Sequence, residues 1–108
     1  SSTMYTSVSV GHPMSAGFDT NGSALTFGSV GRGASSTRSF IYTNSFDFPV
    51  VVELQVNGNI SSLLDYQQAY QVKGKEVIKI PVTAYVPIGL VEGDIYQGNF
   101  SVLVRPTR

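Results

Sequence analysis

The sequence predicts an all-β domain, an antiparallel sandwich of about seven to eight strands. Three segments, residues 50–57, 78–86 and 96–104, alternate apolar and polar side chains with the two-residue period of half-buried strands. Turn residues recur about every eight to twelve positions, and no segment sustains the period of a helix. Because such strands cannot bury their apolar faces alone, a second sheet must cover the first.

In the first half of the chain, short predicted strands are separated by loops and turns that contain glycine. Residues 4–10 alternate Val with Ser and predict a short strand, after which residues 11–23 combine glycines, a proline and an Asn-Gly pair and predict a loop. Residues 25–27 predict a second short strand, and the later turn over residues 31–36 is rich in residues that tolerate positive φ. Residues 37–44 are aromatic and β-branched, which favours a strand.

After the strand at residues 50–57, the pattern becomes irregular. Residues 57–59 predict a turn, and residues 60–65 have the apolar spacing of either one helical turn or a crossover between sheets. Residues 66–72 predict a strand in which Tyr66, Tyr70 and Val72 share a face.

A hairpin-like connection is expected at residues 73–76, before the returning strand at 78–86. Pro81 lies inside that strand and cannot donate a ladder hydrogen bond, which predicts a sheet edge or a bulge there. The last strand covers residues 95–104. The whole of residues 1–108 therefore reads as one domain, with its core between about residues 24 and 105.

Composition excludes several functional classes. Seven Lys and Arg balance seven Asp and Glu, and a scattered net charge of zero argues against a nucleic-acid partner. The chain has no cysteine, so it has no disulfide, thiolate metal site or cysteine nucleophile. No apolar run reaches the length of about 18 residues needed to span a bilayer. The sequence begins at Ser1 without a signal segment, so any membrane attachment would come from an anchor outside this sequence.

Few side chains are candidates for chemistry. His12, with Met4 and Met14, has the donor types of a copper site, but no second His or any Cys completes it, and a loop histidine is the simpler interpretation. Glu92 and Asp94 flank a glycine, which suits a turn better than a calcium site. The sequence therefore predicts no catalytic residues, no metal and no cofactor.

Low charge and abundant Ser, Thr, Asn and Gly favour an extracytoplasmic location, either secreted or at the cell surface. Three Asn-x-Ser triplets support it and make Asn21, Asn59 and Asn99 glycosylation candidates.

Four phrases carry a resemblance to a known fold. They are LTFGSVGRGASSTRSFIYTN at 25–44, FPVVVELQV at 48–56, GKEVIKIPV at 74–82 and EGDIYQGNFSV at 92–102. Together they resemble an immunoglobulin-like domain, which implies Greek-key connections. The phrase F-G-x-V-x-x-G, before a strand that ends in Asn, resembles the major sperm protein and Hydin-type class. The last phrase is similar to the closing hairpin of archaeal cell-surface modules.

Four residues in these phrases are expected to have structural roles. Gly28 and Gly31 suit a sharp change of direction between two strands. Asn44 either adopts a left-handed conformation or holds a turn with its side chain. Tyr96 resembles a tyrosine corner, although that motif belongs to the penultimate strand and Tyr96 is expected on the last one.

Two functions remain open. The first is a non-enzymatic module that binds a protein of the cell envelope or a second copy of itself, as a dimer. The terminal strand at 4–10, with Met4, Val8 and Val10, would offer a free edge, and four aromatic residues would form an exposed patch: Phe18, Phe46, Tyr66 and Tyr85.

By analogy with archaeal surface modules, this would be the soluble domain of a membrane-anchored structural or stator-like component of a surface filament, the archaellum, that binds a surface-layer protein. The alternative is a carbohydrate-binding or accessory domain of a larger secreted protein.

Overall fold

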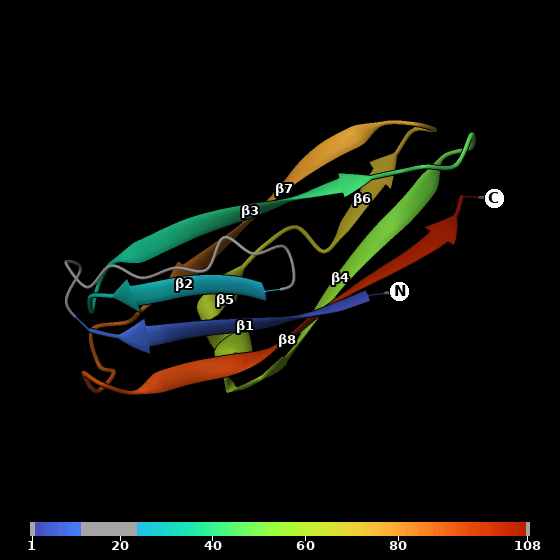
Figure 1. Cartoon of the computed structure of the whole chain (residues 1–108). Helices are drawn as coiled ribbons and strands as arrows, with labels where there is room; N and C mark the ends of the chain where they lie inside the picture. Colours follow the sequence, from blue (N-terminus) through green and yellow to red (C-terminus); the bar gives the residue numbers. More distant parts are fainter. Residues whose placement is uncertain (1, 12–23, 108) are drawn as a thin grey trace.

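A computed structural model describes residues 2–11 and 24–107 (Figure 1). The described chain forms eight strands and one short 3₁₀ helix, in a five-stranded and a three-stranded sheet, which confirms the all-β, two-sheet prediction. In chain order the elements are β1 (Ser2–Val10), β2 (Ala24–Val30), β3 (Ser35–Thr43), β4 (Val50–Gly58), η1 (Asn59–Leu63), β5 (Leu64–Asp65), β6 (Ala69–Val72), β7 (Val77–Tyr85) and β8 (Ile95–Pro106).

The strand order is β2-β1-β8-β4-β6 in the large sheet and β3-β7-β5 in the small sheet. The purely antiparallel prediction is wrong at one place, because β1 and β2 pair in parallel, with Tyr5 beside Ala24. Parallel neighbours need a connection of about a dozen residues. The chain between Val10 and Ala24 supplies that length, which a tight hairpin would not.

The expectation that the first strand is a free edge is also wrong. β1 lies between β2 and β8 and pairs with both, as Figure 1 shows. Val8 and Val10 are each only 1% exposed and belong to the core, whereas Met4 packs half-buried against it. Burial of these alternating apolar side chains holds the strand on the core, since each contributes about 1.5–3 kcal/mol when removed from water.

The core lies between the two sheets. Val50, Val52 and Leu54 of β4 face it, as the alternation at 50–57 predicts. The largest inward side chain of β8 is Phe100, which is fully buried and packs edge-to-face against Phe40 of β3, with ring centroids 6.2 Å apart.

Residues 66–76 differ from the predicted strand and hairpin. Tyr66 lies outside β6, and its ring packs edge-to-face on Phe100 with a centroid distance of 5.0 Å. The turn at 73–76 is not a hairpin, because β6 pairs with β4 in the large sheet while β7 pairs with β3 and β5 in the small one. The turn therefore carries the chain across the core, and Lys75 takes a φ of 64° to do so.

Pro81 lies in the central strand of the small sheet, not at an edge. It stands opposite Ser39 of β3 at a position where the β7 nitrogen faces β5 instead of β3. β5 is only two residues long and pairs with Thr83 and Ala84, so it ends before Pro81. The missing N–H therefore costs no ladder bond, which explains why this sheet tolerates the proline.

Candidate functional site

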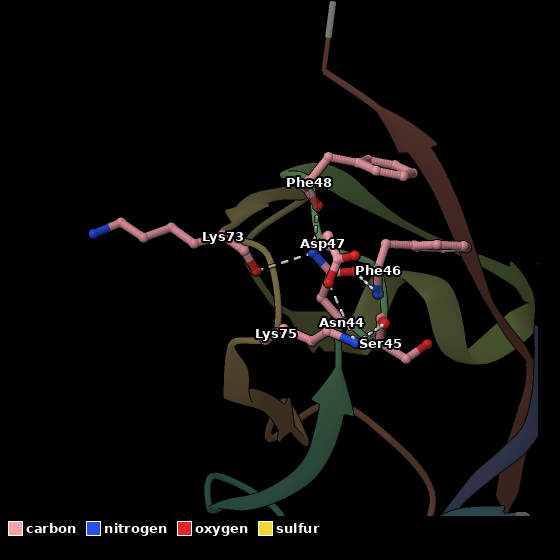
Figure 2. Close-up of polar contacts among 7 residues, drawn as sticks. All are labelled: Asn44, Ser45, Phe46, Asp47, Phe48, Lys73 and Lys75. Carbon is pink, nitrogen blue, oxygen red and sulfur yellow. Dashed lines mark hydrogen bonds and ion pairs between the residues drawn. The ribbon is translucent and has the colours of Figure 1, made fainter.

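A buried asparagine holds the loop between β3 and β4. The Asn44 side chain has no exposed surface, and its Nδ2 donates hydrogen bonds to the carbonyl oxygens of Phe48 and Lys73 at 2.9 Å and to that of Val72 at 3.4 Å. Its Oδ1 accepts a hydrogen bond from the Phe46 backbone at 3.0 Å (Figure 2). Carbonyl oxygens can only accept, which fixes the orientation of the amide. Of the two roles open to Asn44 from the sequence, the structure therefore places its side chain at the centre of the turn.

The turn at 73–76 packs against the loop between β3 and β4 and forms hydrogen bonds with it. The Lys75 backbone nitrogen donates to the Phe46 carbonyl at 3.0 Å, and Lys75 Nζ donates to the Ser45 carbonyl at 2.8 Å and lies 3.5 Å from the Asp47 carboxylate. Gly74 packs so closely against the backbone of Asp47 that no Cβ would fit. The loop is therefore fixed on two sides before any partner approaches.

This rigid loop displays two phenylalanines. Phe46 is 49% exposed and Phe48 is 44% exposed, and their rings stack with centroids 4.9 Å apart and planes 19° apart. Figure 2 shows both rings on one side of the loop, with the Lys73 side chain pointing away on the other. We call residues 44–48 the Asn44 loop. Its aromatic pair is a hydrophobic surface that folding alone does not bury.

The structure does not gather the other predicted interface residues around this loop. Tyr85 is 48% exposed but lies opposite Ser35, whereas the Asn44 loop begins beyond the other end of β3. Tyr66 is partly buried against the core, and Phe18 lies outside the described residues. Phe48 was not among the predicted interface residues. The sequence signal for it was the pair Phe-x-Phe directly before a proline, which places two aromatic residues in a turn.

The remaining sequence candidates are scattered. Asn59 is exposed, and its Oδ1 accepts a hydrogen bond from the Gln97 backbone at 2.8 Å. Asn99 is exposed on β8 between Tyr5 and Asn57, whereas Asn21 lies outside the described residues.

The predicted turn residues also differ in their surroundings. Gly28 has a φ of 68°, and the Gly31 carbonyl accepts a hydrogen bond from Ala34. Tyr96 is half-buried on β8 opposite Val8, and no hydrogen bond joins its hydroxyl to another described residue.

A second set of exposed apolar side chains is aliphatic. Ile88, Val91 and Ile95 lie in or beside the connection from β7 to β8, with exposed fractions of 74%, 64% and 61%. That connection is tied to the end of β1 by a hydrogen bond from Gly93 to the Val10 carbonyl. These residues provide a matched comparison surface at the end of β7 that is remote from the Asn44 loop.

One ion pair lies on the surface of the large sheet, next to the base of the loop. Arg105 Nη2 lies 3.1 Å from Glu53 Oε2, and this hydrogen bond, together with the attraction of the Glu53 charge, raises the pKa of Arg105 above its usual value. The guanidinium therefore stays charged. Beyond it, the Thr107 nitrogen donates to the Pro49 carbonyl and joins the end of β8 to the base of the Asn44 loop.

Residues 2–11 and 24–107 contain no group of three or more His, Cys, Asp or Glu arranged to hold a metal. His12 and Met14, considered as copper ligands, lie outside these residues. None of the described helices is long and apolar enough to cross a membrane.

Comparisons of the chain with models of protein families, with curated proteins and with solved structures found no match.

Proposed function

We propose that this domain is a non-enzymatic interaction module that binds a protein partner through Phe46 and Phe48. The observation that carries the proposal is a stacked, half-exposed aromatic pair on a loop fixed by the buried Asn44. Aromatic anchors dominate the binding energy of many interfaces. A loop that is already ordered loses little conformational entropy on binding, which favours affinity.

The geometry of the rings favours a protein pocket over a sugar. A sugar-binding platform needs ring faces that are open and lie side by side. Here the interplanar angle of 19° and the centroid distance of 4.9 Å mean that each phenylalanine covers one face of the other. The pair instead projects as a single apolar block, which matches an anchor that enters a hydrophobic pocket.

A neutral sheet face supports a second candidate, carbohydrate binding. Tyr5, Asn57, Gln97 and Asn99 are exposed on adjacent strands of the large sheet, and the Tyr5 hydroxyl donates to Gln97 Oε1 at 2.8 Å. Carboxamides beside one exposed ring can hydrogen-bond and stack on a sugar. This face is on the large sheet and is distinct from the Asn44 loop, so substitutions separate the two candidates.

The wider setting is also a proposal. Two packed sheets with β3 and β4 in opposite sheets support an immunoglobulin-like, Greek-key classification. Low charge and the three Asn-x-Ser triplets support an extracytoplasmic location, either secreted or at the cell surface. The resemblance of residues 92–102 to archaeal modules supports a structural, stator-like role that holds a surface filament to an envelope or surface-layer protein.

Co-isolation from the cells that make this protein tests the proposal. We expect Phe46→Ser/Phe48→Ser to lose a partner protein that the unmodified domain and Ile88→Ser/Val91→Ser both retain, since the control removes apolar groups that are even more exposed but lie elsewhere. Retention of the partner by the Phe variant would contradict the proposal. Glycan binding that is lost in Tyr5→Ala but not in the Phe variant would favour carbohydrate recognition instead.

A further inference from the structure

Among the described residues, no strand is hydrogen-bonded to the outer edge of β3, although β2 also approaches β3. β3 is nine residues long and pairs only with β7, on one side. The other edge strands are blunted, because β5 has two residues, β6 has four, and the pairing of β2 with β1 is interrupted by a register shift. Short length and bulges are the usual protections of a sheet edge. β3 has neither.

Two hydrogen bonds show which backbone groups of β3 face outward. Val86 donates to the Ala34 carbonyl at one end of the β3–β7 ladder, and Asn44 donates to the Glu76 carbonyl at the other. In an antiparallel pair, residues bonded to the neighbour alternate with residues that are not. The even-numbered residues of β3 therefore bond to β7. The N–H and C=O groups of the odd-numbered ones point to the free edge: Ser35, Thr37, Ser39, Ile41 and Thr43.

We infer that this edge pairs with the same edge of a second copy of the chain, antiparallel and centred on Ser39. The five outward-facing positions are symmetric about Ser39, so a two-fold axis there pairs Ser39 with itself, Thr37 with Ile41 and Ser35 with Thr43. Every outward donor then meets an acceptor, giving about ten inter-strand hydrogen bonds. The result is one six-stranded sheet with the order β5-β7-β3-β3-β7-β5.

Side chains select this register over its neighbours. A shift of two residues in one direction would place Arg38, the only charged residue of β3, directly opposite its own copy. The opposite shift would leave Ser35 without a partner. In the central register, Arg38 faces Phe40 of the second copy, an arrangement that suits a guanidinium beside a ring. Ile41, which is 62% exposed, gains a neighbour in Thr37 of the second copy.

In the unpaired domain, the Arg38 side chain covers part of the outer edge of β3. Its Nη1 donates to the Ser36 hydroxyl and to the outward-facing Thr37 carbonyl, each at 3.1 Å. Inward-directed charge is another protection against unwanted pairing. Pairing with the second copy requires the guanidinium to release Thr37, whose carbonyl then accepts from Ile41 of that copy.

The pairing does not rest on the proposed function, but the bivalency that it would give the domain does. Because the strands run antiparallel, the two Asn44 loops would lie at opposite ends of the shared edge, about 45 Å apart at roughly 3.3 Å per residue. Two linked binding sites can raise avidity by about 10²–10⁴ without new contacts.

Cysteine substitution tests the register cleanly, because the natural chain contains no cysteine. Ser39→Cys places two thiols on the proposed axis, where the Cα separation of about 5.5 Å in a bonded pair permits a disulfide. We expect oxidation to give a covalent dimer at least about tenfold faster than for Asn99→Cys, since pairing raises the local thiol concentration. Equal rates, or cross-linking only between Ser39→Cys and Ile41→Cys chains, would overturn the proposed register.

Light scattering of cysteine-free protein gives the second readout. We expect the mass to rise to twice that of the chain with concentration, and Ser39→Pro to remain monomeric, because its lost N–H faces the free edge and not β7. A wild-type chain that stays monomeric at millimolar concentration would overturn the inference. The protein-binding proposal would then stand or fall separately, on whether Phe46→Ser/Phe48→Ser loses its partner.

Discussion

The Asn44 side chain and the Lys73 carbonyl oxygen are joined by a hydrogen bond of 2.9 Å, although 29 positions separate the two residues in sequence. The bond connects the loop after β3, in the small sheet, to the turn after β6, in the large one. One buried carboxamide thus fixes the end of the sandwich and positions Phe46 and Phe48. The proposed binding at this loop would therefore depend on a residue that a partner does not touch.

Replacing Asn44 with Ala should destabilise the domain by about 2–4 kcal/mol, because it leaves buried or half-buried carbonyls without their donor. Urea denaturation followed by intrinsic fluorescence measures the change. Asn57→Ala, on the exposed face of β4, is the control and should change the free energy of unfolding by less than about 0.5 kcal/mol. Similar small effects for both variants would show that Asn44 does not hold the loop.

The two phenylalanines should be energetically coupled. A double-mutant cycle with Phe46→Ala and Phe48→Ala is expected to give a coupling free energy of about 0.5–1.5 kcal/mol, the range for aromatic pairs. Both rings are half-exposed, so each single variant should remain folded. Strict additivity of the two changes would mean that the rings do not stack in solution.

Thr6 offers a stabilising substitution. Its side chain is completely buried in β1, and its hydroxyl has no hydrogen-bond partner among the described residues. Thr6→Val keeps the shape and removes the unsatisfied group, so the free energy of unfolding should rise by about 1 kcal/mol. Thr3→Val, which is exposed on the same strand, should be nearly neutral. A loss of stability in Thr6→Val would reveal a hydrogen bond to that hydroxyl.

Replacement by alanine should reduce the stability of the domain at Gly98 but not at Gly89. A Cβ at Gly98 would overlap the Asn57 carbonyl oxygen of the adjacent strand, whereas nothing lies within 4 Å of a Cβ at Gly89. Gly98→Ala should cost at least about 2 kcal/mol because backbone must move to accommodate it. Gly89→Ala should leave the melting temperature nearly unchanged. Equal effects would contradict the close approach of β4 and β8.

Period-two alternation in the sequence was sufficient to predict the all-β fold and the core face of β4, because alternate side chains of a strand must lie on opposite faces. It could not reveal that Val8 and Val10 belong to an enclosed strand, since an edge strand and a central strand that face the same core share one pattern. The neighbours of β1 come from residues about 20 and 90 positions away.

The candidate site was predictable only in part. A polar residue at the end of a strand marked Asn44 as a turn residue, but its four partners come from the loop itself and from residues 72–73. Phe46 was identifiable as an aromatic residue outside a strand. Phe48 lies just before the predicted strand at 50–57, and only the three-dimensional loop shows it stacked beside Phe46.

Photo-crosslinking from inside the Asn44 loop is the sharpest test of whether Phe46 and Phe48 bind a protein partner. A benzoylphenylalanine replaces Phe48 in one protein and Ile88 in another, and both are irradiated in the cells that make the domain. We expect a probe at position 48 to label one partner protein and Phe46→Ser to weaken this labelling. We expect no labelling of that partner from position 88, although Ile88 is the more exposed side chain. Labelling of that partner from position 88 but not from position 48 would contradict the proposed binding.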